Sequence, residues 1–346
     1  MSLRNTDIAE LLARAADAVE GHRARAYRTA ARAALMWGEE IADVIGQGRS
    51  PAELERVGPS LARRIGAWIE EDVPVPDAPP ARRGFLSYAE ARSLLASDRS
   101  LEGLRGDLQM HTVLSDGKAT LEEMASTGAG HGYEYVAITD HSKGLKIAGG
   151  IDEEMLAHQR AHIDAFNREL ADDGVAFTVL RSLEMNLDEE GNGDMEPSAL
   201  TKLDIVLGSF HSALRRTEDR TPRFLAALRN PFVHVIGHPR GRKFNLRTGL
   251  NADWAEVAEA AAAAGKALEV NAYPDREDLS VDILELVRDA GGWISIGTDA
   301  HDPSEMRFVD IGVASALRAG IPRARILNFL SRDELVAWAA RTTPAC

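Results

Sequence analysis

The sequence predicts an α/β protein in which a seven-stranded β/α barrel, closed or slightly distorted and TIM-like, follows a small all-α domain. Two observations lead to this fold class. Apolar strand-like runs recur seven times in about 240 residues, and stretches with helical periodicity lie between most of them. Alternating strands and helices indicate a parallel sheet, and seven such units have the size of a barrel. An open doubly wound sheet is the alternative architecture.

The N-terminal residues have the periodicity of short helices. Apolar residues recur at three- and four-residue spacing in residues 7–21 and 24–37. Residues 53–71 add a helix, a turn at Val57-Gly58-Pro59 and a second helix. Three or four short helices therefore form the first unit.

Proline marks the end of this helical unit. The stretch VPVPDAPPARRG, residues 73–84, contains four prolines, and residues that precede proline are biased towards extended conformations. We therefore expect a stiff linker here. The predicted organisation is an all-α domain over residues 1–72, a proline-rich linker with a short helix over 73–103, and the barrel over 104–346.

The elements of the barrel follow in order. The clearest helices between strands occupy residues 151–173, 252–265 and 281–291. Strands are expected where short apolar runs occur between turn-forming residues. These strands are residues 106–112, 134–141, 177–186, 204–211, 232–239, 267–273 and 293–301.

Bulk composition limits the classes of function. The single cysteine is Cys346, so internal disulfides and thiolate metal sites are not expected. The same scarcity of cysteine predicts a reducing, cytoplasmic location. No run approaches the roughly 18 apolar residues of a membrane span, and the first residues lack the pattern of a signal peptide. The net charge of −14 argues mildly against a generic nucleic-acid binder, although it does not exclude a local basic site.

Side chains of the metal-ligand type cluster where the predicted strands end. In a β/α barrel, functional residues gather at the C-terminal ends of the strands. Most of these residues also lie two positions from a polar neighbour on the same strand face, as Thr139 and His141 do, so their side chains converge on one lumen. The residues are His111, Asp116, His141, Glu184, His211, His238, Asp299 and His301.

Imidazoles and carboxylates are the ligands that zinc and manganese select when thiolates are absent. This set exceeds one tetrahedral shell, so we expect two or three divalent ions, zinc or manganese, with iron as a further option. Glu184 is the expected bridge because a carboxylate has two oxygens. Such a centre activates water and stabilises phosphoryl displacement. Phosphoester hydrolysis is the expected chemistry, and amide hydrolysis on a similar barrel is the competing one.

Gln109 departs from this ligand pattern. In the stretch DLQMHTVLSDG, residues 107–117, strand periodicity places Gln109 beside His111 on the polar face. From the residues alone, two interpretations stay open. Gln109 is either a metal ligand or a substitution that leaves one metal position weak or empty.

Three further histidines are not expected to bind metal. His158 and His162 have the i, i+4 spacing of some zinc sites, but they lie among charged residues of a predicted helix, which favours a solvated face. His234 lies four residues before His238 in the same predicted strand, so a structural role within the lumen is expected.

The ordered motifs from about Leu104 to Arg341 resemble the polymerase and histidinol phosphatase (PHP) family. They are DLQMHTVLSDG, AITDHS, a strand ending in Glu184, GSFHS, IGHPRGR, EVNAYP and GTDAH. The likeness is closest to the PHP domain of bacterial family X DNA polymerases, especially in NPFVHVIGHPRGRKFNLRTG and NAYPDREDL. The resemblance implies a distorted seven-stranded barrel, a trinuclear metal site, and 3′-5′ exonuclease or end-processing phosphoesterase activity on DNA.

The same resemblance assigns the ligands to three metal positions. The first would be held by His111, Glu184 and Asp299, with Gln109 where the family usually has another histidine. The second would be held by Asp116, His141 and His301. The third would be held by Glu184, His211 and His238. The residues expected to act in catalysis are Glu184, His211, His238 and Asp299.

Further polar side chains near the strand ends complete the expected site. Those that would clamp a substrate phosphate are Lys143, Arg240, Arg242 and Lys243. Glu269 and Asn271 face the same lumen and would orient substrate or ligands.

The N-terminal unit also resembles a family X polymerase. AELLARAADAVEGHRARAYRTAARAA resembles its first helices, and ELERVGPSLARRI resembles a helix-hairpin-helix, which offers backbone N–H groups to DNA phosphates. Arg56 stands where the hairpin usually has its first glycine. The polymerase palm has no room between residues 73 and 104. The expected DNA contacts are Val57, Gly58, Ser60 and Arg63.

Three functions stay open at this point. The first is a DNA phosphodiesterase acting from 3′ ends in DNA repair, which the helix-hairpin-helix-like unit favours. The second is a small-metabolite phosphatase of the histidinol phosphatase type, towards which the acidic net charge leans. The third is a DNA-binding protein with an impaired metal site, which the otherwise complete ligand motifs disfavour. The sequence leaves the oligomeric state open.

Overall fold

The barrel consists of seven parallel strands in the order β1 to β7. The computed structural model describes residues 3–341, so Cys346 lies outside the described residues. Every neighbouring pair of strands is parallel. A parallel bridge between Met110 and Ala300 brings β7 back to β1. The predicted β/α barrel is confirmed, and the doubly wound alternative is wrong because the consecutive strand order has no switch point.

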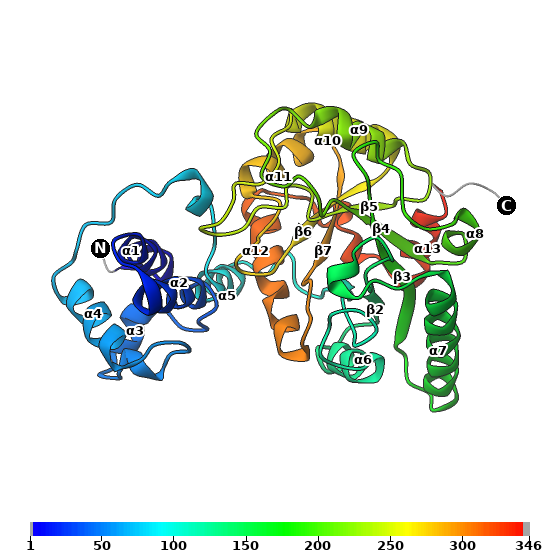
Figure 1. Cartoon of the computed structure of the whole chain (residues 1–346). Coiled ribbons are helices and arrows are strands. Elements are labelled where there is room, and N and C mark those ends of the chain that lie inside the picture. The colour runs from blue at the N-terminus through cyan, green and yellow to red at the C-terminus, as the bar shows by residue number, and fades with distance from the viewer. Residues whose placement is uncertain (1–2, 342–346) are drawn as a thin grey trace.

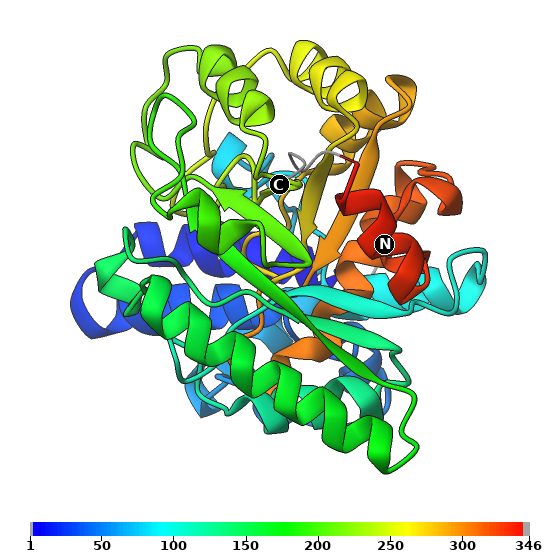
Figure 2. The ribbon, with the colours of Figure 1, turned by 90° about the vertical axis from the view of Figure 1, so that its right-hand side faces the viewer.

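Helices follow the strands and surround the sheet, as Figures 1 and 2 show. The strands are β1 Gly106–Met110, β2 Tyr135–Ile138, β3 Thr178–Asn186, β4 Ile205–Ser209, β5 Val235–Gly237, β6 Ala267–Asn271 and β7 Trp293–Gly297. The helices are α6 Leu121–Gly130, α7 Glu153–Asp172, α8 Pro197–Leu200, α9 Thr221–Arg229, α10 Trp254–Ala264, α11 Val281–Asp289, α12 Val309–Arg318 and α13 Arg332–Ala339. None of the described helices is long and apolar enough to cross a membrane.

The interior of the barrel changes from apolar to polar along the strands. At the start of β2 and β4 the inward side chains are apolar, as at Tyr135 and Ile205, and Trp338 of α13 packs with them. Because side chains alternate with period two, the same strand faces continue towards His141 and His211. The apolar part stabilises the barrel, and the polar part gathers at the C-terminal ends of the strands.

The N-terminal helices form a lobe beside the barrel (Figure 1). They are α1 Asn5–Asp17, α2 Gly21–Ala34, α3 Ile41–Gly46 and α4 Pro59–Glu70. The lobe has its own buried apolar cluster, which includes Leu12, Trp37 and Ile65. The three domain boundaries themselves stay predictions.

The helix expected at the start of residues 53–71 is wrong. A short 3-10 turn over Pro51–Glu53 replaces it, with Ser50 as its cap, and the chain then runs irregularly until Pro59 begins α4. Arg56 has a φ of 63°, in the left-handed region that interrupts a helix and favours glycine. Arg56 therefore has the backbone conformation that glycine usually adopts at this position of the hairpin.

The linker attaches this lobe firmly to the barrel. Arg82 is nearly buried and lies 2.8 Å from both Glu10 of α1 and Asn245 of the barrel. The ring of Phe85 packs edge-on against Phe244 of the barrel, with 5.3 Å between centroids. Helix α5, Tyr88–Ser97, follows this linker segment and packs against α12. The lobe is thus held in a fixed place relative to the ends of the strands.

Candidate metal centre

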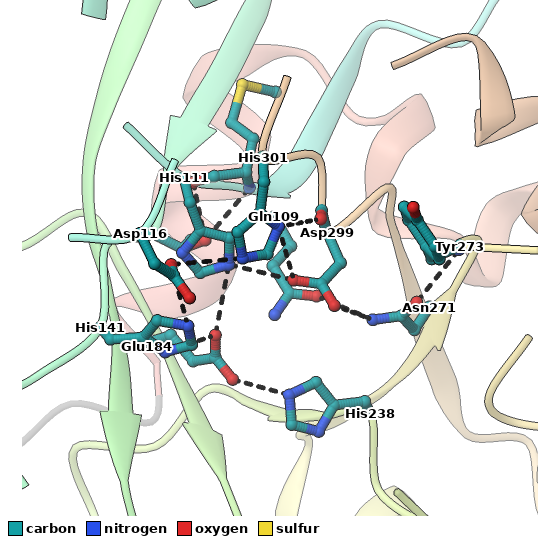
Figure 3. Close-up of polar contacts among 12 residues, drawn as sticks. Gln109, His111, Asp116, His141, Glu184, His238, Asn271, Tyr273, Asp299 and His301 are labelled. Carbon is teal, nitrogen blue, oxygen red and sulfur yellow. Dashed lines mark hydrogen bonds and ion pairs between the residues drawn. The ribbon is translucent and has the colours of Figure 1, made fainter. Parts of the chain in front are cut away.

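The eight predicted ligand residues lie together at the mouth of the barrel, and Figure 3 labels all of them except His211. Two of them sit in unusual backbone conformations, with φ of 26° at His238 and 54° at Asp299. The His238 N–H donates to the Glu269 carboxylate at 2.6 Å, and the Asp299 N–H donates to the Gln109 carbonyl at 3.0 Å. These bonds hold both side chains in place against a conformational cost on the order of 1 kcal/mol each.

Glu184 lies at the centre of the cluster. Its side chain is buried at the end of β3. Oε1 lies 3.2 Å from His211 Nε2 and 2.8 Å from His238 Nε2. Oε2 lies 3.4 Å from His111 Nε2 and 3.2 Å from His141 Nδ1. Each carboxylate oxygen therefore faces its own pair of imidazoles, which is the arrangement of a bridging ligand.

Asp116 and Asp299 complete the cluster on either side of His111. Asp116 Oδ1 lies 3.5 Å from His141 Nε2 and 3.2 Å from His301 Nε2. Asp299 Oδ1 lies 3.1 Å from His111 Nε2. The His111 ring stacks against the rings of both His141 and His301, with 4.4 Å between centroids in each case.

The groups of ligand-type residues in the structure are nearly the three ligand sets expected from the sequence. The first expected set, His111, Glu184 and Asp299, comes together with its ligand atoms within 4.8 Å of one another. The second set, Asp116, His141 and His301, comes together and includes His111 as well. In the third group His141 joins Glu184 and His211, and His238 is not part of the group although it lies 2.8 Å from the same Glu184 oxygen that His211 contacts. The assignment of individual ions to these groups stays a proposal.

The donor set fits divalent cations. Within residues 3–341, neither carboxylate oxygen of Glu184 has a hydrogen-bond donor of suitable geometry, although imidazole nitrogens lie 2.8 Å and 3.2 Å away, and His111 Nδ1 and His141 Nδ1 likewise have no such partner. A buried carboxylate without such partners is unfavourable unless a cation compensates its charge. Several imidazole nitrogens and carboxylate oxygens meet around it, and these are ligands of zinc and manganese.

The charges of the cluster shift the pKa values of its members. Burial alone would raise the pKa of Glu184, but the imidazoles of His141 and His238 hold it well below its usual range. Burial likewise opposes ionisation of Asp299, whose pKa is nevertheless lowered well below its usual range by Arg276 and then by His111. Burial lowers the pKa of His141 to about 3. The two carboxylates are therefore ionised, and His141 is neutral, as metal ligands must be.

Gln109 lies in the lumen next to Asn271 and Asp299 (Figure 3). It is buried, and its Oε1 is 3.5 Å from Asn271 Nδ2. Its Nε2 has no hydrogen-bond partner within the described part of the chain. Asn271 in turn donates to Asp299 Oδ2 at 3.1 Å, so it orients a ligand, as expected. Gln109 thus occupies a position from which a side chain can reach the metal centre.

Arg276 belongs to the site and is not among the predicted residues. It follows β6, and its Nε lies 3.3 Å from Asp299 Oδ2. Its charge stabilises the ionised form of that carboxylate, and its guanidinium is still partly exposed to the cavity described below. The sequence feature that could have identified Arg276 is the motif NAYPDRED, in which Arg276 lies five residues after Asn271.

Three of the four predicted phosphate-binding cations are exposed in part. Lys243 lies 3.5 Å from Asp275 in the cavity beside the metal centre. Arg240 lines a different cavity, between the linker and α11. Lys143 is paired with Glu153 at 2.6 Å, which a phosphate would have to displace. Their role in binding phosphate stays a proposal.

The prediction that Arg242 clamps the substrate phosphate is wrong. Its side chain is 5% exposed. The guanidinium donates to the carbonyls of Arg83, Gly84, Arg276 and Glu277 and stacks 4.0 Å from the ring centroid of Phe85. Its donors are occupied by the linker and by the loop after β6, so Arg242 joins these two segments.

We expect Arg242→Ala to lower the free energy of unfolding by about 3 kcal/mol, because it leaves Glu277 buried without its cation. Urea unfolding monitored by circular dichroism measures this, with Arg229→Ala on the exposed surface as the control. If Arg242→Ala instead leaves the stability unchanged and reduces turnover, the original prediction that Arg242 binds the substrate phosphate would be supported.

His158 and His162 lie on the surface, as expected. The expectation that His234 lies within the lumen is wrong, because His234 shares the strand face of Ile236, which packs on the outer side of the sheet, whereas Val235 faces the lumen. His158 is exposed, and His162 forms a surface ion pair with Glu122 at 2.7 Å. His234 is buried, and its Nδ1 accepts a hydrogen bond from the Val206 N–H at 2.9 Å. These contacts are structural.

Of the four hairpin residues expected to contact DNA, one is buried and three are exposed. Val57 is buried, and its N–H donates to the Leu54 carbonyl at 3.2 Å, so the predicted phosphate contact at Val57 is wrong. Gly58, Ser60 and Arg63 are exposed at the start of α4, and their contact with DNA stays a proposal.

A cavity of about 560 Å³ connects the N-terminal lobe with the metal centre. We call it the interlobe cleft. One wall comes from the lobe and includes Thr29, Arg32 and Arg56, and the opposite wall and floor include Arg276, Asp299 and His301. A molecule bound at the metal centre therefore lies next to side chains of the lobe.

Comparison with known proteins identifies relatives of two kinds, although no family model matches the chain. The chain is 34% identical over 268 residues to the DNA polymerase/3′-5′ exonuclease PolX of Bacillus subtilis, covering 77% of this chain and 46% of PolX. It thus spans less than half of that relative. It is 30% identical over 237 residues to the probable phosphatase YcdX of Escherichia coli, covering 65% of this chain and 90% of YcdX.

Among solved structures, the fold is similar to a histidinol phosphate phosphatase from Lactococcus lactis that was crystallised with zinc, L-histidinol and phosphate. The TM-score is 0.46 at 16% sequence identity, and the match covers 63% of this chain and 94% of that one.

Proposed function

Since this chain belongs to the PHP family of metal-dependent phosphoesterases, we propose that it hydrolyses phosphodiester bonds in DNA, as a 3′-5′ exonuclease or end-processing enzyme of DNA repair. The observation that carries the proposal is the interlobe cleft. A small phosphomonoester needs only the mouth of the barrel, whereas here an arginine-bearing helical lobe borders the metal centre. Such a wall is useful for a substrate that extends beyond one phosphate.

The extent of the PolX similarity supports the same proposal. Residues 104–346 make up about 70% of the chain, so a match over 77% extends beyond the barrel at least into the linker. The match to YcdX, over 65% of the chain, requires no more than the barrel.

The residues of the centre have distinct tasks in this hydrolysis. Glu184 and Asp299 supply ionised oxygens at the bottom of the mouth, and the buried Glu269 fixes the loop that carries His238. Arg276 projects from the side of the cleft, where it neutralises charge next to Asp299 and orients a phosphate oxygen. Bound divalent cations would supply the Lewis acidity for in-line displacement at phosphorus.

We propose two or three such ions. The three groups of ligands described above would hold them, with Glu184 shared between groups. Zinc, manganese or iron suits imidazole and carboxylate donors.

The proposed function is tested with purified protein, Mn²⁺ or Zn²⁺, and 5′-labelled single-stranded and gapped DNA. Histidinol phosphate is assayed in parallel. Shortening of DNA from its 3′ end, abolished by His238→Ala, supports the proposal. Turnover of histidinol phosphate without DNA cleavage overturns it.

A small-molecule phosphatase is the second candidate, because the chain covers 90% of the probable phosphatase YcdX. The same paired assay decides between the two. Inactivity on both substrates with metals bound would instead favour a DNA-binding protein with an impaired centre, which an electrophoretic mobility assay would then detect.

We expect metal binding to release protons at neutral pH. Burial opposes the charged forms of His238 and His301, but the carboxylates of Glu184 and Asp116, respectively, outweigh it and raise both pKa values to about 9. Both imidazoles are therefore protonated at pH 7 in the metal-free protein and must become neutral to bind metal. Metal affinity should rise with pH up to about 9.

Isothermal titration calorimetry in two buffers of different ionisation enthalpy measures this release. We expect about two protons per chain at pH 7. Uptake of metal without proton release would show that neither His238 nor His301 changes protonation on binding.

A further inference from the structure

The interlobe cleft continues directly from the metal centre. Asp299 and His301 form part of its lining, and helix α2 and the hairpin at Arg56 lie opposite them. A volume of about 560 Å³ exceeds what a single phosphate group requires and suits a mononucleotide. The part of a substrate adjacent to the reacting phosphate would therefore lie in this cleft.

Positive side chains converge on the cleft from both lobes. Those in its lining are Arg32, Arg56, Lys118, Lys243, Arg276 and Arg307. The carboxylates among them already have partners. Asp275 lies 3.5 Å from Lys243 and 3.9 Å from Arg32, and Glu305 accepts the His301 N–H at 2.8 Å. Asp299 lies 3.3 Å from Arg276, and Glu55 lies 3.4 Å from Arg56. Both side chains of the Arg56–Glu55 pair are exposed, so the pair is weak and a phosphate can displace it. Among residues 3–341, Lys118 and Arg307 have no carboxylate within 4.0 Å, so cationic groups are available to a phosphate.

Two aromatic residues, Tyr273 and Phe308, are part of the lining of the cleft. The rings of Tyr273 and Phe308 meet edge to face with 5.9 Å between centroids, and the Arg307 guanidinium lies 4.9 Å from the centroid of Phe308. Proteins that bind single-stranded nucleic acid combine cations for the backbone with aromatic rings on which bases stack. The cleft contains both.

Helix α2 extends the positive surface away from the cleft. Arg25, Arg28 and Arg32 are exposed and are spaced by three and four residues, so they follow one face of the helix over about two turns. Only Arg32 reaches the cleft. The other two lie further along the same face of the helix, outside the cleft.

We propose that the interlobe cleft binds the nucleotide next to the scissile phosphate, and that Arg32 and Arg56 of the N-terminal lobe contact the phosphate of that nucleotide. This inference rests on the proposed function and deepens it. The lobe is then part of the substrate site, and it confers preference for an oligonucleotide over a phosphate ester of one small group. Tyr273 supports the base, and Arg25 and Arg28 contact phosphates further along the strand.

Two substitutions remove the contacts without disturbing the lobe. Arg32→Ala truncates an exposed side chain on a helix. Arg56→Gly removes the guanidinium and suits the φ of 63° at this position, so it should leave the thermal midpoint unchanged or raise it. Arg23→Ala is the matched control, because Arg23 is exposed on the same helix but lies nine residues from Arg32, about two and a half turns, on the opposite face.

The metal-loaded variants are assayed on a 5′-labelled single-stranded oligonucleotide and on bis-p-nitrophenyl phosphate. We expect each substitution to lower kcat/KM for the oligonucleotide about tenfold, and both together more, while turnover of the small diester changes less than about twofold. Arg23→Ala should match the wild type on both. Equal losses on the two substrates, or no loss on either, would overturn the proposal.

Failure of the proposed function gives a different result. If the wild type hydrolyses the small diester but does not cleave DNA, the function is wrong, and binding tests the cleft by itself. Fluorescence anisotropy of the oligonucleotide with wild-type protein should then still depend on Arg32 and Arg56. Binding that is unchanged in the double variant contradicts the cleft as the nucleotide site.

Discussion

Glu184→Gln is expected to lower phosphoesterase activity by about a thousandfold and to reduce the metal content of the purified protein. Glu184 is buried, and each of its carboxylate oxygens faces two imidazoles. Glutamine has nearly the same shape, but it has no charge and only one oxygen, so it cannot bridge two metal positions. The charge that attracts the ions and the geometry that holds them are lost together.

Elemental analysis and steady-state kinetics measure the two effects on one preparation. Asp107→Asn is the matched control, since Asp107 is also a buried carboxylate on a strand of the barrel. Its oxygens accept hydrogen bonds from Thr298 and from the Gln109 N–H, and an asparagine can replace them because the Thr298 hydroxyl can also accept. Metal content should therefore stay at the wild-type value in this control. A Glu184→Gln protein with full metal content and activity would exclude Glu184 as the bridge.

The position of the centre could be predicted because it depends on local periodicity. In a parallel barrel, alternate residues of every strand face the lumen, and the strands end at the same side. Residues such as His141 and His211 therefore had to meet once the strands were recognised. The closing of the barrel between Met110 and Ala300 then brings Asp299 and His301 to His111.

Contacts between segments far apart in the sequence could not be predicted in this way. Arg242 follows a strand end just as Arg240 does, and only the fold shows that Phe85 and two linker carbonyls cover it. Arg276 reaches Asp299 from a loop whose path has no periodicity. The local pattern fixes which residues leave the barrel mouth, but it does not fix which segments pack over them.

The N-terminal lobe illustrates the same limit. Its helices follow from their apolar spacing, but its place beside the metal centre depends on Arg82 and on the packing of Phe85 with Phe244. Those contacts bring Arg32 and Arg56 to the cleft. A sequence that predicts two units does not predict the site that forms between them.

Gln109→His is expected to raise the metal content by up to one ion per chain and to raise activity about tenfold. The side chain of Gln109 is buried beside Asn271 and Asp299, and a neutral carboxamide is a far poorer ligand than imidazole. Gly297 lies against it, and a Cβ there would come within 2.5 Å of the Gln109 Cβ, so the missing side chain makes room for a ring. Single groups that tune a metal site typically change affinity or activity by about 10- to 100-fold.

Gln109→Leu separates the two interpretations of this residue, because leucine has a similar size and no donor atom. If Gln109 only leaves a metal position weak, Gln109→Leu keeps the wild-type metal content while Gln109→His raises it. If Gln109 is itself a ligand, Gln109→Leu loses metal. Should Gln109→His change neither metal content nor turnover, the position does not limit the centre, and the ions held through Glu184 account for all of the activity.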